Sequence, residues 1–341
     1  ESEGNADYYY GFFWGGMPDL NYDNPKVRQE MIKVGQFWLE EMGVDGFRLD
    51  AARHVYPDDR PNDSHAWWME FGDAMRAIKP DVYMVGEVWG DASEIGPYLQ
   101  GLTSMFNFEL WRGLNKILTA ESNDDLITKL NTTRTVYADY NEDFVDAVFF
   151  NNHDQNRLLS NVDGHPEKAK LAASILLTLP GMPYLYYGDE IGMLGEKPDP
   201  EIREPFLWDD AGAELMQTSW IAGKNSNDST VVPLRRQMDD PQSIYHWYRQ
   251  MITLRNNHES LRTGALKPLS LPDYLLGYSR STSEHQLNVI HNLSGKSQVI
   301  DSVSLKLNNV LLSSTGTVIG DGKITLSPFG TIIYFTRQSG S

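Results

Sequence analysis

The chain has 341 residues, 40% of them hydrophobic and 22% charged, which is enough for about two globular domains. It carries 29 basic and 47 acidic residues, a formal net charge of −18, which opposes binding to nucleic-acid phosphates and favours neutral or cationic partners. Cysteine is absent, so disulfides, thiolate metal sites and cysteine nucleophiles are excluded. The longest apolar runs, such as Ala172 to Pro180, are much shorter than the ~20 residues that span a bilayer, and we expect no membrane segment.

Helices and strands alternate through the first two thirds of the chain. Apolar residues at helical spacing predict a helix from Asn24 to Met42, and a strand follows at Gly46 to Asp50. The pattern repeats with a helix from Ser64 to Ile78 and a strand from Val82 to Val85. Further strands are predicted at Met105–Phe108, Ala147–Phe150 and Tyr184–Tyr187, with intervening helices that include Glu167–Leu179. This alternation predicts a parallel sheet with right-handed crossovers.

Three of these strands lead into carboxylates, Asp50, Glu87 and Asp154. Parallel barrels carry their chemistry at the carboxyl ends of the strands, which favours a (β/α) barrel over a Rossmann-like sheet. The chain also lacks a G-x-G-x-x-G turn after a strand and a G-x-x-x-x-G-K-[ST] loop. We therefore expect no nucleotide site and no organic cofactor.

The pattern changes after a helix predicted from Ile244 to Asn256. Short β-rich runs follow, separated by Gly, Ser and Asn, at Leu287–His291, Val303–Leu307, Val310–Leu312 and Thr331–Phe335. Such runs predict a separate all-β module, most simply a sandwich.

Taken singly, each strand-end carboxylate has an alternative explanation as a turn or helix-cap residue. In a closed barrel, however, Asp50, Glu87 and Asp154 would converge on one mouth, and their crowding would raise the pKa of at least one of them. Glycosidic cleavage needs such a set, with one carboxyl group as acid and another as nucleophile or base. Arg48 lies two residues before Asp50, on the same face of the strand, where its charge would hold that carboxylate ionised.

Five short motifs resemble the sequence regions of the α-amylase family, glycoside hydrolase family 13. They are MPDLN (Met17–Asn21), GFRLDAARH (Gly46–His54), GEVW (Gly86–Trp89), NNHD (Asn151–Asp154) and GMPYLYYGDEIG (Gly181–Gly192). In that family the first motif ends a domain inserted after the third barrel strand, and the last resembles the eighth strand. The motifs stand in the family's order and cover nearly the whole chain, so together they are far more specific than any one of them.

The resemblance implies a retaining mechanism with two displacements. Asp50 matches the nucleophile, Glu87 the general acid/base, and Asp154 the third carboxylate, which binds two ring hydroxyls and helps to distort the sugar. Arg48 matches the arginine beside the nucleophile, and His153 a histidine that binds sugar hydroxyls.

The resemblance also implies further substrate contacts. Arg53, where many amylases have lysine, and His54 would face the leaving-group side. Trp89 is a candidate sugar platform, and Asn152 and Arg157 are further candidate substrate-binding residues. The backbone carbonyl of His54 matches a calcium ligand of many amylases, so a structural Ca²⁺ is the one cofactor the resemblance suggests, although most of its other ligands would come from segments not present here.

Substrate preference depends on fewer residues. The residues after the two catalytic candidates, Ala51 and Val88 with Trp89, resemble those of α-1,4-acting amylases. The segment NNHDQNR (Asn151–Arg157) is closer to that of glucosidases. MPDLN is intermediate between oligo-1,6-glucosidases and neopullulanases and is similar to subfamily 36. These features predict a retaining, endo-acting hydrolase of α-1,4 bonds in starch or maltodextrins. The alternatives are an exo-acting α-glucosidase, a neopullulanase, a transglycosylase, or a non-catalytic carbohydrate-binding homologue.

The motif positions predict three segments: residues 1–22 as the end of the inserted domain, 23–262 as barrel strands four to eight, and 263–341 as the β-sandwich. The aromatic run Tyr8–Trp14 offers rings for sugar stacking, but packing of the inserted domain explains most of them better. Barrel strands one to three have no counterpart, and five strands alone would leave open edges. We therefore expect a missing N-terminal portion of the same enzyme to be this chain's protein partner. The cellular compartment stays open.

Overall fold

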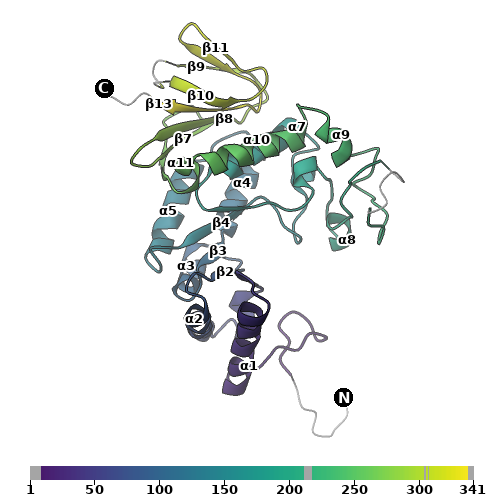
Figure 1. Ribbon diagram of the computed structural model, residues 1–341, viewed down its shortest axis with the longest axis vertical. Helices are drawn as coiled ribbons and strands as arrows, with labels where there is room; N and C mark the ends of the chain where they lie inside the picture. The colour runs from purple at the N-terminus through teal and green to yellow at the C-terminus, as the bar shows by residue number, and fades with distance from the viewer. Residues whose placement is uncertain (1–8, 211–216, 303–304, 306, 337–341) are drawn as a thin grey trace. The chain divides into compact units, whose positions relative to one another are not determined.

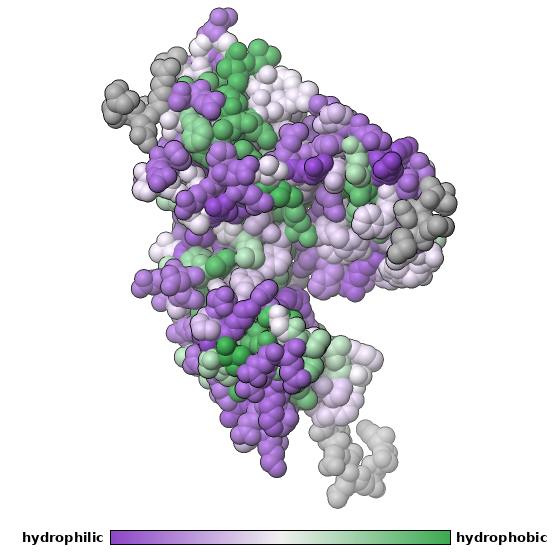
Figure 2. Space-filling view, viewed as in Figure 1, coloured by the Kyte–Doolittle hydropathy of each residue, from purple (hydrophilic) through white to green (hydrophobic). Residues whose placement is uncertain are grey.

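The structure is a computed structural model that describes residues 9–210, 217–302, 305 and 307–336. Its contacts divide the chain into two compact units, Glu1–Glu109 with Thr133–Ala147, and Leu110–Thr132 with Val148–Ser341. Figure 1 labels many of the helices and strands used below. Hydrophilic residues cover much of the face seen in Figure 2. No helix in the described part of the chain has both the length and the apolar character needed to span a bilayer.

The first unit contains parallel strands and the helices between them. Its strands are β1 (Gly46–Leu49), β2 (Tyr83–Gly86), β3 (Ser104–Phe106) and the start of β4 (Val145–Phe149). Its helical elements are α1 (Pro25–Gln36), η1 (Phe37–Glu41), η2 (Ala52–Val55), α2 (Pro61–Ile78), α3 (Ala92–Ile95), η3 (Gly96–Gln100), the start of α4 (Phe108–Ala120) and the end of α5 (Leu126–Ala138).

Local signals explain where these elements begin and end. The Asn24 side chain accepts a hydrogen bond from the Lys26 backbone and Pro25 occupies the first turn, so α1 has a capped start. The predicted helix continues after α1 as the π-helical turn η1, and it ends before Gly43, whose φ is +70°. Gly46 is required where β1 meets β2, because a Cβ atom there would lie 1.9 Å from the Tyr83 carbonyl oxygen.

The strands of the first unit pair in parallel. β1 pairs with β2, β2 with β3 and β3 with β4, and the first of these ladders runs from Gly46 opposite Tyr83 to Leu49 opposite Gly86. Parallel pairing in register brings the carboxyl ends of β1 and β2 to one edge. The core of the unit is apolar and includes Met75 and Met84, both with 0% exposure.

The second unit contains the end of β4, the strand β5 (Met182–Tyr184) and further helices. In the order of the sheet, β5 follows β4. The remaining helical elements are α6 (Leu158–Asn161), α7 (Pro166–Thr178), η4 (Asp189–Ile191), α8 (Asp199–Ile202), α9 (Leu234–Met238), α10 (Ile244–Asn257) and α11 (Glu259–Arg262). The strand predicted at Tyr184–Tyr187 therefore ends earlier than expected, because the chain turns into Gly188, whose φ is +90°.

The C-terminal part forms two antiparallel sheets, as predicted. The larger has the order β10-β13-β8-β7-β6 and the smaller the order β11-β12-β9. The strands are β6 (Ala265–Pro268), β7 (Leu275–Ser281), β8 (Gln286–Asn292), β9 (Gln298–Asp301), β10 (Leu307–Ser313), β11 (Val318–Gly320), β12 (Lys323–Leu326) and β13 (Thr331–Thr336). Of the run predicted at Val303–Leu307, residues 303, 304 and 306 lie outside the described residues.

Both faces of the larger sheet are buried. Ile332 packs with Ile324 of the smaller sheet, whereas the next residue, Ile333, belongs to the core that contains α7 and α10. This alternation follows from the two-residue period of a strand. The larger sheet is therefore an inner layer of the second unit.

Candidate active site

Asp50 and Glu87 lie side by side because their strands are in register. Leu49 pairs with Gly86, and each carboxylate is the first residue after its strand. The backbone ladder continues past the strands, with Glu87 N donating to Leu49 O at 3.0 Å and Ala52 N donating to Glu87 O at 2.9 Å. Both side chains are thereby fixed at the carboxyl edge, where parallel α/β proteins carry catalytic groups.

Arg48 joins the two carboxylates. Its Nη1 donates to Asp50 Oδ1 and its Nη2 donates to Glu87 Oε2. A guanidinium between two carboxyl groups holds them close together through charge-assisted hydrogen bonds. The sequence prediction that Arg48 faces Asp50 is consistent with this contact, and the bond to Glu87 was not anticipated.

The environments of the two carboxylates differ. The Glu87 residue is 6% exposed, and Trp89 Nε1 donates to Glu87 Oε1 at 3.0 Å. The Asp50 side chain is 79% exposed, so a ligand can approach its oxygens. Trp89 itself is half-exposed and its ring stacks on Phe108 with centroids 4.2 Å apart. One shielded and one accessible carboxylate is an arrangement that suits an acid/base group beside a nucleophile.

A strained residue turns the chain away from Asp50. Ala51 has φ 42° and ψ 44°, a left-handed conformation that is unfavourable for a residue with a Cβ atom. The core of the unit holds the turn in place, because Trp68 Nε1 donates to Ala52 O at 2.7 Å and Ala52 is fully buried. It leads directly into η2, which carries Arg53 and His54.

Arg53 and His54 lie among acidic and aromatic groups of the first unit. Arg53 Nη1 donates to Glu94 Oε1 at 3.0 Å, and His54 Nδ1 lies 3.2 Å from Asp58 Oδ1. Burial lowers the pKa of His54 below its usual value, although Asp58 opposes this effect. The His54 ring stacks on Phe12 with centroids 4.0 Å apart.

The aromatic run before MPDLN presents rings at the surface of the first unit. Tyr9, Tyr10, Phe13 and Trp14 are exposed, while Tyr8 lies outside the described residues. Backbone hydrogen bonds from Asp19 N to Tyr10 O and from Met17 N to Trp14 O close the loop on itself.

The third carboxylate, Asp154, belongs to the second unit, in the loop after β4. Arg203 holds this loop: its Nη2 donates to Asp154 Oδ1 at 2.7 Å and its Nε donates to His153 O at 2.8 Å. His153 Nε2 lies 3.1 Å from Asp154 Oδ2. Asn152 Oδ1 accepts a hydrogen bond from Asp154 N at 2.8 Å, so Asn152 shapes the loop.

Arg203 was missed from the sequence. Its only local signal is a single arginine inside the acidic stretch Asp199–Glu204, which is most simply explained as a solvated charge. One of its partners, Asp199, is four positions earlier, but the others are about 50 positions earlier, and nothing in the local pattern points to those.

Arg157 lies inside the packing of the second unit. Its residue exposure is 0%, its Nη1 donates to Tyr187 O, and its guanidinium lies 4.4 and 4.5 Å from the ring centroids of Tyr186 and Tyr187. The structure thus places this side chain below the surface, whereas the sequence predicted a substrate contact.

Among the described residues, no three or more His, Asp or Glu side chains are grouped so that they could hold a metal ion. The calcium ligation suggested for the His54 carbonyl stays a prediction, and no step proposed below involves a metal.

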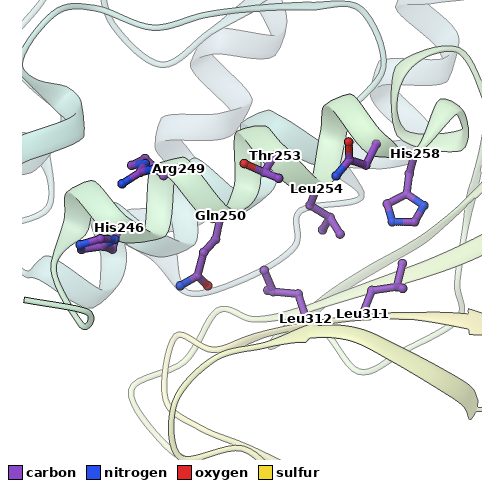
Figure 3. A pocket seen from close by; sticks show the side chains of 9 residues that line it. His246, Arg249, Gln250, Thr253, Leu254, His258, Leu311 and Leu312 are labelled. Atoms are coloured by element: carbon purple, nitrogen blue, oxygen red, sulfur yellow. The ribbon is translucent and has the colours of Figure 1, made fainter. Parts of the chain in front are cut away.

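An open groove of about 540 Å³ lies elsewhere in the second unit, between α10 and β10 (Figure 3). It is lined by mostly polar side chains of α10, by His258 directly after that helix and by two leucines of β10: His246, Arg249, Gln250, Thr253, Leu254, Asn257, His258, Leu311 and Leu312. It contains none of the strand-end carboxylates, so we do not assign the reaction to it.

Comparison with known proteins decides the family. Residues 2–264 match the family model described as "Alpha amylase, catalytic domain". The chain belongs to the α-amylase family. This membership, in glycoside hydrolase family 13, confirms the predicted fold class of a partial (β/α)8 barrel followed by a β-sandwich domain. The assignment to subfamily 36 stays a prediction.

Individual α-amylase family members show how much of the fold is present. The chain is 40% identical to "Alpha-amylase 3" of Dictyoglomus thermophilum over 96% of its own length and 65% of that protein. It is 33% identical to a 4-alpha-glucanotransferase of Thermotoga maritima, covering 88% of this chain and 66% of that protein. The crystal structure of an α-amylase from H. orenii superposes with a TM-score of 0.87 and 34% identity, over 96% of this chain and 68% of that one. The chain thus spans about two thirds of the length of these family members.

Proposed function

We propose that this chain carries the catalytic carboxylates of a retaining α-glycoside hydrolase that cleaves internal α-1,4-glucosidic bonds of starch or maltodextrins. The observation that carries the proposal is the pairing of Asp50 and Glu87 through one guanidinium, that of Arg48, at the carboxyl edge of a parallel sheet. Family membership and the α-amylase at 40% identity support the substrate class.

The proposed reaction has two displacements. Glu87 gives its proton to the glycosidic oxygen as Asp50 attacks the anomeric carbon, so the leaving sugar departs with a hydroxyl group and a glycosyl ester forms on Asp50. Glu87, now ionised, then takes a proton from water, whose oxygen attacks the same carbon and releases Asp50. Arg48 positions Asp50 and Glu87 relative to one another by its two hydrogen bonds, and Trp89 orients Glu87 by a third.

The remaining candidate residues are assigned to substrate binding. Asp154, fixed by Arg203, is assigned the hydroxyl contacts that the family gives to its third carboxylate, with His153 beside it. Arg53 and His54 are assigned to the leaving-group side. Arg157, being buried, would act on substrate only through the residues packed on it.

The test is the configuration of the first product. Proton NMR during hydrolysis of a maltodextrin is expected to show the α-anomer first, since retention needs two inversions at one carbon. Initial release of the β-anomer would refute the retaining assignment. In the same assay Glu87→Gln is expected to lose activity by roughly 10²–10⁴-fold, the usual contribution of general acid–base catalysis.

A transglycosylase is the second candidate, because a 4-alpha-glucanotransferase is 33% identical to the chain. The same glycosyl ester would then react with a sugar hydroxyl in place of water. Two incubations separate the candidates. With maltotriose, formation of longer maltodextrins would indicate transfer. With starch, mixed short oligosaccharides would indicate endo-hydrolysis, and glucose alone would indicate an exo-glucosidase. A non-catalytic homologue would release nothing from any of these substrates.

We also propose that a further polypeptide portion of the enzyme covers the first unit. β1 is the edge strand of its sheet, and α1 and η1 leave large apolar side chains exposed, namely Val34, Phe37, Trp38 and Met42. Uncovered edges and apolar patches of this kind favour association. A longer form of the protein that includes the preceding region is expected to unfold at higher temperature than this chain, and an equal melting temperature would refute the proposal.

A further inference from the structure

A buried amide–carboxylate pair lies under the loop that carries Asp154. Asn151 and Asp189 are 3% and 5% exposed, and Asn151 Nδ2 donates to Asp189 Oδ1 at 3.1 Å. Asn151 begins the NNHD segment after β4, and Asp189 begins η4 after β5. One hydrogen bond thus connects the ends of two strand–loop junctions within the second unit.

The loop is held at both of its ends. Asn151 is anchored from inside by Asp189, while Arg203 binds Asp154 and the His153 carbonyl from the more exposed side. Between these anchors Asn152 Oδ1 accepts from Asp154 N at 2.8 Å. These hydrogen bonds restrain the four-residue segment, so the carboxylate of Asp154 can move little as long as Asn151 stays fixed.

Asp189 is itself on a rigid base. Its backbone N donates to Tyr186 O at 3.1 Å, and Gln237 Nε2 donates to Ile191 O at 2.7 Å, so both ends of η4 are tied. The preceding Gly188 has φ +90°, and a Cβ atom there would lie 2.5 Å from Met193 Sδ. The turn therefore has one well-packed form from which the Asp189 side chain meets Asn151.

Three titratable groups surround Asp189. Arg157 directly precedes α6, Glu190 is the next residue of η4, and the neutral Tyr248 lies on α10. Burial raises the pKa of Asp189 to about 7, with Asn151 and Arg157 opposing the effect and Glu190 adding to it. Either protonation state keeps a carbonyl or carboxylate oxygen for the Asn151 amide.

We propose that Asp189 is a positioning residue for the reaction, which fixes Asn151 and, through the Asn151–Asp154 loop, the carboxylate of Asp154. The inference rests on the proposed role of Asp154 as the third carboxylate. Asp189 does not touch the sugar; it sets where Asp154 meets the ring. A displacement of about 1 Å at such a group costs on the order of 10²-fold in rate.

The experiment compares two replacements of Asp189 with a matched pair elsewhere. Asp189→Ala removes the acceptor and is expected to lower kcat 10- to 100-fold per folded molecule with KM within about threefold. Asp189→Asn keeps an acceptor oxygen and is expected to restore kcat to within about threefold of the original enzyme. Should Asp189→Ala fail to fold, Asn151→Ala removes the donor of the same bond and is expected to give the same loss of kcat.

Asp146 supplies the matched control. It is 1% exposed and accepts from Asn107 Nδ2 at 3.0 Å, as Asp189 does from Asn151, and it also accepts from Arg134 Nη1 at 3.4 Å, all within the first unit. Asp146→Ala is expected to lower the melting temperature but to change kcat per folded molecule by less than about twofold. An equal loss of kcat in Asp146→Ala and Asp189→Ala would overturn the proposal.

A double-variant cycle separates this inference from the function on which it rests. If Asp189 acts through Asp154, the double variant Asp154→Asn with Asp189→Ala is expected to match Asp154→Asn alone. Losses that multiply would refute the positioning role while leaving the function intact. Full activity of Asp154→Asn by itself would refute the assigned role of Asp154, whatever Asp189 does.

Discussion

Two arginines on β-strands show how differently one side chain can be used in this protein. Arg48 on β1 is one-third exposed and donates to the carboxylates of Asp50 and Glu87. Arg280 on β7 is fully buried and donates to the backbone carbonyls of Thr178 and Gly264. The first therefore organises charges that solvent and substrate can reach, while the second satisfies one carbonyl at the end of α7 and one after α11.

The surroundings of Arg280 extend this contrast. A chain of buried hydrogen bonds links α7 to the larger sheet: Thr178 Oγ1 to Tyr278 OH at 2.6 Å, Tyr278 OH to His291 Nε2 at 3.0 Å, and His291 Nδ1 to Thr331 Oγ1 at 2.8 Å. We call these four residues with Arg280 the seam. A buried polar network in which each member has a partner rigidifies the elements it joins. The comparison thus teaches that accessibility separates reactive polar groups from stabilising ones.

The largest expected effect tests the reactive side. Asp50→Asn is expected to lower kcat by roughly 10⁴-fold or more, because the amide cannot form the glycosyl ester. The melting temperature is expected to change little, since the Asp50 side chain is 79% exposed and its ion pair with Arg48 is accessible to water. Thermal unfolding and initial rates on starch measure the two quantities. Strong destabilisation of this variant would show that Asp50 stabilises the fold as the seam residues do, and would contradict the contrast between reactive and stabilising polar groups.

Arg280→Met gives the opposite pattern. It leaves the Thr178 and Gly264 carbonyls without their buried donor, and we expect a loss of about 3–5 kcal/mol in the free energy of unfolding. Urea denaturation measures this loss. The kcat of the folded fraction is expected to stay within about twofold, and a specific loss of kcat at unchanged stability would contradict the stabilising role.

The pH dependence of stability sharpens the comparison, because two buried groups act in opposite directions. Burial lowers the pKa of His291 to about 3, so unfolding takes up a proton below pH 6.5 and stability falls as the pH drops from 6.5 towards 3. Burial raises the pKa of Asp189 to about 7, so unfolding releases a proton above pH 4 and stability falls as the pH rises from 4 towards 7.

The two slopes oppose one another between pH 5 and 6.5, each amounting to about 2 kcal/mol over that interval. With Asp189→Asn, the His291 slope remains and stability is expected to rise with pH. With His291→Gln, the Asp189 slope remains and stability is expected to fall with pH. Urea denaturation at a series of pH values measures both, and parallel curves for the two variants would refute the assignment.

The smallest expected effect concerns Trp89. Trp89→Phe removes the indole donor to Glu87 and keeps a ring to stack on Phe108, so kcat is expected to fall about 3- to 10-fold, as for loss of one ordinary hydrogen bond. Initial rates on maltodextrins measure the loss. If Trp89→Phe is as active as the original enzyme but Trp89→Ala is not, the ring acts as a sugar platform and its hydrogen bond to Glu87 is dispensable.

Much of the fold was predictable because its signals are local. The amphipathic period, the Asn24–Pro25 start and the run Val82–Val85 are properties of short segments, and the helices and strands lie close to where they were expected. The error at β5 also has a local cause, since Tyr186 and Tyr187 have strong β-propensity but pack instead on the buried Arg157 guanidinium. Tertiary packing overrides a propensity there.

The candidate site was predictable only in part. Strand-end position and motif resemblance identified Asp50, Glu87 and Asp154, because each follows directly from a short pattern. Arg203 and Asp189 were missed, since their contacts with the Asp154 loop join residues about 40 to 50 positions apart. No period or cap relates residues at such separations, so only packing brings them together.

The sequence by itself determined the family, the order of elements and the acidic strand ends, because each depends on neighbouring residues. It placed Arg48 beside Asp50, but it indicated neither the contact of Arg48 with Glu87 nor any partner for Arg280, which stands between two serines of its strand. The tertiary structure decided both. Arg48 lies near the open edge of a parallel sheet beside two carboxylates, whereas Arg280 lies on a sheet that is covered on both faces, where backbone carbonyls are its partners.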